Sequence, residues 1–136
     1  MRDLANHLSV KRAISPVSIS DNSPLVSQIV DLSGFDKAMF AIVTGSIADA
    51  DATFTVLVQH GNDPALSDAA DVPDSQLTGT EAAAGFKFDS DDQTRKIGYV
   101  GPKRYLRLTI TPANNTGAAL ISAVAILSGS RYTPTA

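Results

Sequence analysis

The sequence predicts a single all-β domain, a jelly-roll-like β-sandwich of roughly eight strands with an N-terminal arm. Two segments, residues 53–59 and 104–111, alternate apolar and polar residues, as a strand with one buried face does. Glutamate, which favours helices, occurs once among the 14 acidic residues, at Glu81, whereas the turn-favouring aspartate is frequent. A chain of 136 residues suffices for one domain with its own hydrophobic core.

Turn-forming residues divide the chain into short extended segments. We expect strands over residues 16–20, 25–32, 37–45, 53–59, 85–88, 95–100, 104–111 and 119–127. Segment 37–45 is apolar at successive positions, which predicts a strand buried on both faces, and it should form a hairpin with 53–59. A second hairpin is expected between 95–100 and 104–111. The core positions predicted in the second of these strands are Leu106, Leu108 and Ile110.

The ends of the alternating pattern set the predicted domain boundaries. Residues 1–13 show no clear period and are expected to form an arm that is mobile in the free protein. Residues 14–130 are assigned to the sandwich and residues 131–136 to a tail. Within the sandwich, residues 61–79 are rich in Asp, Ala, Pro and Ser, which predicts a long loop.

The composition argues against several classes of function. The chain has no cysteine, so disulfides, thiolate metal sites and cysteine nucleophiles are impossible. The net charge of -3 disfavours a general nucleic-acid binder, which needs positive charge on one face. No apolar run is long enough to span a membrane, and the N-terminal residues lack a signal-peptide pattern, so folding in a cytoplasm is expected.

Catalytic machinery is not evident in the sequence. His7 and His60 are the only histidines, and neither lies beside a recognisable nucleophile motif such as G-x-S-x-G. We therefore expect a protein that is not an enzyme and that uses no cofactor.

Aspartates cluster in two of the predicted turns, and calcium takes such oxygen ligands. The two groups are Asp49 with Asp51, and Asp89 with Asp91 and Asp92. The spacing of an EF-hand is absent, and aspartate in a turn commonly accepts hydrogen bonds from the nearby backbone. We therefore expect no metal site.

Positive charge is concentrated in one stretch of this net acidic chain. Five of the 11 basic residues are Arg95, Lys96, Lys103, Arg104 and Arg107. One interpretation is a surface that docks onto an acidic protein surface, such as the Asp-rich loops of a neighbouring copy. The other is an ordinary solvated face. Nucleic-acid binding is a weaker interpretation because stacking aromatic residues are few.

Several motifs resemble those of a known group of proteins. They are DLSGFD at 31–36, TGSIAD at 44–49, ATF at 52–54, RKIGYVG at 95–101, KRYLRLT at 103–109 and GAAL at 117–120. The resemblance is to small proteins encoded in the structural gene blocks of tailed phages and prophages, often close to the major capsid gene. It covers most of residues 25–130 and implies a component of the virus particle.

The resemblance implies a head decoration, cement or vertex protein, a minor capsid protein that binds the capsid lattice as a homo-oligomer. Its partners would be the major capsid protein and copies of itself, without a membrane, in a virion assembled in the host cytoplasm. The candidate interface joins the five basic residues above to five residues of the arm, Arg2, Leu4, Leu8, Lys11 and Arg12. The alternatives are a neck or tail component and a host-surface carbohydrate-binding module, although the chain has no Trp and three Tyr.

Overall fold

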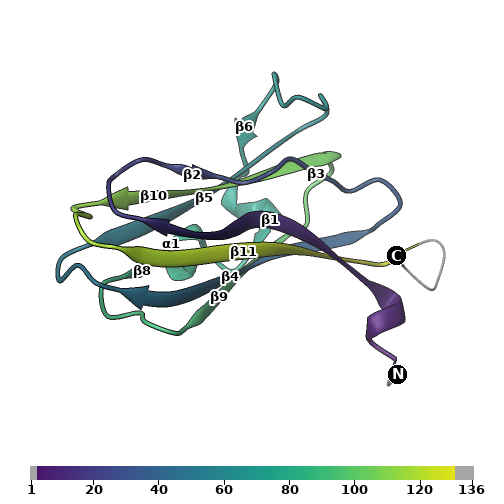
Figure 1. The fold of residues 1–136 in the computed structure, drawn as a ribbon. Helices are drawn as coiled ribbons and strands as arrows, with labels where there is room; N and C mark the ends of the chain where they lie inside the picture. The colour runs from purple at the N-terminus through teal and green to yellow at the C-terminus, as the bar shows by residue number, and fades with distance from the viewer. Residues whose placement is uncertain (1–2, 131–136) are drawn as a thin grey trace.

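The computed structural model describes residues 3–130, and it confirms an all-β sandwich of two antiparallel sheets. Figure 1 shows the two sheets as stacked layers, with the N-terminus projecting beyond one end. The five-stranded sheet contains, in spatial order, β1 (Leu8–Ile19), β11 (Ala119–Ser128), β4 (Lys37–Ile47), β9 (Thr94–Tyr99) and β7 (Leu77–Thr78).

The six-stranded sheet is built around two long central strands. Its main path runs β2 (Leu25–Val26), β10 (Tyr105–Ala113), β5 (Thr53–Gly61) and β6 (Ala70–Asp71). Two further short strands join it, β3 (Val30–Asp31) on β10 and β8 (Phe86–Lys87) on β5. The helical segments are single turns, η1 (Ala5–His7), η2 (Asp74–Gln76) and α1 (Glu81–Ala84).

The core lies between the sheets and follows the period of two along the long strands. Leu106, Leu108 and Ile110 on β10 are at most 1 % exposed, which confirms the predicted inward face. From the opposite sheet, Phe40 and Ile42 on β4 contribute side chains that are equally buried.

Both predicted hairpins are wrong. Strands β4 and β5 are consecutive in the chain but lie in different sheets, and so do β9 and β10. Strand β5 pairs with β10, whereas β4 pairs with β11 and β9. Alternation fixes which residues face the core, but it does not say whether the next strand continues the same sheet or crosses to the other one.

The predicted arm over 1–13 is also too long. Strand β1 begins at Leu8 and pairs with β11 along its whole length, with Lys11 opposite Ala125. Ser9 and Ala13 are each 2 % exposed. The pattern concealed this strand because its inward position is the polar Ser9, whereas the apolar Val10 is 62 % exposed, and register shifts after Arg12 then interrupt the alternation.

Two further expectations need correction. Strand β4 is buried on one face only, since Val43 is 46 % exposed while Phe40 and Ile42 are buried. The segment 61–79 is not a plain loop, because it contains β6, η2 and β7, and its Leu66 is 4 % exposed.

Candidate functional site

The basic residues predicted to form one surface are distributed over both sheets. Arg95 and Lys96 lie on β9 in the five-stranded sheet, whereas Arg107 lies on β10 in the six-stranded sheet. Lys103 and Arg104 belong to the connection between these strands. The candidate interface is therefore not a single patch, because the hairpin on which it depended does not exist.

Two of these arginines already have partners within the chain. Arg104 donates from Nε and Nη2 to the two carboxylate oxygens of Asp31, at 2.9 and 3.0 Å. This pair holds the pKa of the Asp31 carboxyl below its usual range. Arg107 donates to the side-chain oxygen of Gln59 on the neighbouring strand. Both arginines thus connect elements of the six-stranded sheet, although exposed pairs contribute little stability singly.

The residues proposed for the arm differ in their surroundings. Leu4 is 61 % exposed and precedes η1, and Leu8 is half-buried at the beginning of β1. Lys11 and Arg12 are exposed on β1. Arg2 lies outside the described residues.

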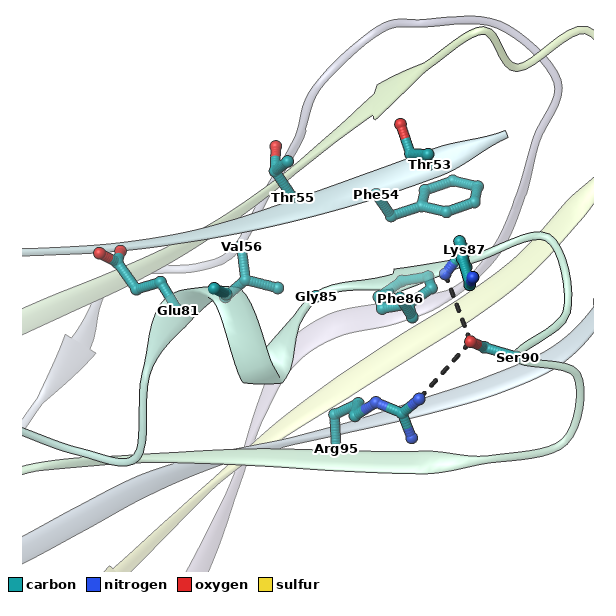
Figure 2. Close-up of a pocket in the computed structure, with 11 residues that line it drawn as sticks. Thr53, Phe54, Thr55, Val56, Glu81, Gly85, Phe86, Lys87, Ser90 and Arg95 are labelled. Carbon is teal, nitrogen blue, oxygen red and sulfur yellow. Dashed lines mark hydrogen bonds between the residues drawn. The ribbon is translucent and has the colours of Figure 1, made fainter. Parts of the chain in front are cut away.

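A cleft of about 580 Å³ opens where β5, α1 and β8 meet. Figure 2 shows the rings of Phe54 and Phe86 facing each other at its wall. Their centroids are 4.8 Å apart and the rings are nearly parallel, and each side chain is at most 5 % exposed. The rings therefore stack on each other and offer no open face to a ligand.

Polar groups that line the cleft form hydrogen bonds within the chain. Strand β5 pairs with β8 near one end and with β6 near the other, so the edge between them has no neighbouring strand. Glu81 occupies part of this gap, and its Oε2 accepts the backbone N–H of Val58 at 2.7 Å. On the opposite wall, the hydroxyl of Ser90 accepts from the Lys87 N–H and from Arg95 (Figure 2). No histidine lines the cleft. The carboxylate of Glu81 takes the place of a neighbouring strand by accepting a backbone N–H on the edge of β5.

Sequence reasoning missed the role of Glu81. Its status as the only glutamate in the chain was the available signal, and Thr80 before it is an N-cap whose Oγ1 accepts from Ala83. That short turn aims the carboxylate at the edge of β5.

His60 and Tyr99 form a buried polar bridge between the two sheets. Tyr99 Oη accepts from the Lys103 N–H at 2.9 Å and shares a hydrogen bond of 2.8 Å with His60 Nδ1, whose direction follows the tautomer of the ring. Burial lowers the pKa of His60 and raises that of Tyr99, and Lys103 adds to the effect on His60. Both groups are therefore neutral at physiological pH, which suits a structural bridge.

Two aspartates of the predicted turns, Asp49 and Asp91, accept hydrogen bonds from the backbone. Asp49 accepts from the Asp51 N–H and from both the N–H and the hydroxyl of Thr116. The hydrogen bonds from Asp51 and then from Thr116 hold the pKa of the Asp49 carboxyl far below its usual range. Residues 3–130 contain no group of three or more side chains placed to hold a metal ion. Within the same residues, no helix is long and apolar enough to cross a membrane.

Comparison with known proteins gives likenesses of fold only. The sequence matches no family model and no curated protein. Among solved structures, a chain in the capsid of Ralstonia phage GP4 aligns with a TM-score of 0.51 and 9 % identity, covering 97 % of this chain and 90 % of that one.

Two longer proteins contain a similar sandwich. Infectious bursal disease virus VP2, from a subviral particle, gives a TM-score of 0.57 at 10 % identity, over 93 % of this chain and 33 % of that one. The CBM22-1–GH10 modules of Clostridium thermocellum xylanase 10B, complexed with xylohexaose, give a TM-score of 0.52 at 14 % identity. That alignment covers 95 % of this chain and 26 % of the xylanase chain. This chain thus spans about a third or less of those two proteins. At these identities the three likenesses establish the β-sandwich fold that capsid and carbohydrate-binding proteins share.

Proposed function

We propose that this chain is a non-enzymatic structural protein of a tailed-phage virion, and specifically a head decoration, cement or vertex protein. In this role it binds the major capsid protein and acts in repeated copies, as a homo-oligomer, in particles assembled in the host cytoplasm. The proposal includes no cofactor and no catalytic step.

One observation carries the proposal. The phage capsid chain is similar along nearly its whole length, whereas the other two proteins contain the sandwich as one part of a longer chain. A chain that consists almost entirely of such a sandwich is therefore found in a phage capsid. The resemblance of residues 25–130 to proteins encoded near capsid genes points the same way.

The physical character of the chain fits this role. Charged residues make up 18 % of the sequence, below the usual quarter of residues. Fewer charged side chains would therefore have to lose their hydration when the surface is covered by a partner. Subunits on a shell are positioned by symmetry, and many weak contacts add up through multivalency. Modest interfaces are therefore sufficient for stable attachment.

Carbohydrate binding is the second candidate, because the xylanase module shares the fold and the cleft is of ligand size. The aromatic geometry disfavours it. Among residues 3–130, Phe88 is the one aromatic side chain more than a third exposed, at 40 %. Calorimetric titration with xylohexaose should give no binding, and micromolar affinity would favour this candidate over the virion role.

The copy number in purified particles separates the structural roles. A lattice cement should be present in hundreds of copies, a vertex protein in tens, and a neck or tail component in about a dozen or fewer. Quantitative mass spectrometry of virions from the phage that encodes the chain measures this ratio against the major capsid protein. Absence from the particle would overturn the proposal.

A further inference from the structure

The five-stranded sheet is free of negative charge. Its strands β1, β11, β4, β9 and β7 contain no aspartate or glutamate, although the chain has 14 acidic residues and a net charge of -3. The same strands carry Lys11, Arg12, Lys37, Arg95 and Lys96. The acidic residues that do lie on strands, Asp31 and Asp71, belong to the six-stranded sheet. The two sheets thus differ sharply in charge.

Two of these cations, Lys37 and Lys96, lie on the outer face of the five-stranded sheet, which is the side turned away from the core, whereas the guanidinium of Arg12 on the edge strand contacts the side chain of Gln28 between β2 and β3. Pairing places Arg12 opposite Val124, Val124 opposite Ala41, and Ala41 opposite Lys96. This row therefore has an apolar centre with Lys96 at one flank. Lys37 lies four residues before Ala41 on β4, so its side chain points to the same outer face.

The neighbouring positions extend the apolar centre along the strands. One row beyond, Val10 lies opposite Ile126, which in turn lies opposite Met39. Val10 is 62 % exposed, and Val43 and Leu120 are each 46 % exposed. Such side chains normally turn inward, so a sheet that presents them in adjacent rows indicates a surface covered by a partner.

Hollows at both ends of the outer face would receive apolar side chains. One, of about 540 Å³, lies between Leu8, Met39, Val100 and Ile126, where Gly98 opposite Met39 leaves the sheet without a side chain, and Asp36 and Lys37 also line it. The other, of about 380 Å³, is lined by Val17, Val43 and Leu120. Apolar anchors that fill pockets supply most of the affinity in protein interfaces.

The charges identify the kind of partner. The outward-pointing charges of β4 and β9, Lys37 and Lys96, are both positive, so a two-fold pairing of this face with itself would set cations against cations. Nucleic acid would require stacking aromatic residues, and these strands place none outward. Insertion into a lipid surface is favoured by aromatic side chains at the interface, and the aromatic residues of these strands, Phe40 and Tyr99, are buried.

We propose that the outer face of the five-stranded sheet is the docking surface for a different protein, one that presents an apolar patch bordered by carboxylates. The inference rests on the proposed function, under which this partner is the major capsid protein. Apolar contact supplies the affinity, and the flanking cations set the orientation and the selectivity against a second copy.

Two variants with matched controls test the surface. Val43→Lys places a charge in the apolar centre, and Thr111→Lys makes the corresponding change at an exposed position on β10. Lys96→Glu reverses a flanking charge, and Lys87→Glu reverses an exposed charge on β8. All four positions are solvent-exposed, so the variants should fold, and circular dichroism with a melting curve verifies this.

The assay is co-sedimentation of labelled protein with heads purified from phage that lack the chain. We expect Val43→Lys and Lys96→Glu to weaken binding about tenfold or more, while Thr111→Lys and Lys87→Glu stay within about twofold of the wild type. Binding of the wild type should also weaken as salt increases.

Four other outcomes overturn the inference in distinguishable ways. If the wild type binds heads and all variants bind equally, the docking surface is wrong while the proposed function stands. If the wild type neither occurs in particles nor binds heads, both fail. If Val43→Lys converts an oligomer to a monomer in light scattering, a second copy covers this face. If the wild type binds vesicles of anionic phospholipid and Lys96→Glu abolishes that binding, the partner is a membrane.

Discussion

Leu108 offers the sharpest test of how the sandwich is held together. It lies in the middle of β10, opposite Val58 on β5, and its side chain is 0 % exposed. The backbone of Leu108 donates to the Ser27 hydroxyl and accepts from the Ser27 N–H, so substitution of the side chain leaves these hydrogen bonds possible. Replacing it with alanine therefore isolates the contribution of the apolar side chain.

The expected cost follows from burial. Leu108→Ala removes three carbons from the core, and at roughly 0.8 kcal/mol each this gives about 2.4 kcal/mol of lost transfer free energy. A residual cavity adds to it, so the free energy of unfolding should fall by about 2–5 kcal/mol. For a domain of this size the melting temperature should drop by roughly 10 °C or more.

Urea unfolding followed by circular dichroism measures this change. The matched control is Thr109→Ala on the same strand, a half-buried position with the opposite orientation, which should cost less than about 1 kcal/mol. If Leu108→Ala changed the midpoint no more than Thr109→Ala does, the assignment of the inner face of β10 would be refuted.

The remaining predictions concern the N-terminus, the inter-sheet bridge, the sheet edge and metal. Deleting residues 1–7 should leave the melting temperature nearly unchanged, whereas deleting 1–13 removes half of β1 and should lower it clearly; equal effects would contradict the strand boundary. Because the pKa of folded His60 lies below its ordinary value of 6.5, the unfolded chain takes up the proton first as the pH falls, so stability should decline below about pH 6.5. His60→Gln should remove that part of the pH dependence, and an unchanged slope would rule out His60 as its source. Glu81→Ala should cost about 1–3 kcal/mol in urea unfolding because the Val58 N–H loses its acceptor, and Glu81→Gln should cost less, since an amide oxygen can still accept; the reverse order would contradict this role. Chelation of divalent cations should leave the melting temperature unaltered, and a drop would reveal a structural ion.

The positions of the strands were largely predictable, whereas their partners were not. The period-two pattern of residues 104–111 reflects a real difference between a core face and a solvent face, so it locates Leu108 correctly. The pairing of β4 with β11 rather than with β5 depends on contacts between residues distant in the sequence. The first half of β1 stayed hidden because it buries Ser9 and exposes Val10, the reverse of the expected pattern, and two register shifts follow Arg12.

The candidate site was predictable only in part. The sequence shows that cations gather between residues 95 and 107, but the sheet to which each belongs decides whether they act together. The apolar outer face was misread for a physical reason. Val43 and Met39 look like core residues because burial in an interface and burial in a core select the same side chains.

A reconstruction of the particle from the phage that encodes this chain tests the central claim most directly. The account predicts density for the sandwich on the head in many copies, with the outer face of the five-stranded sheet against the major capsid protein. Carboxylates of that protein should lie beside Lys37 and Lys96. Density in which this face points into solvent, or a head without the sandwich, would contradict the account.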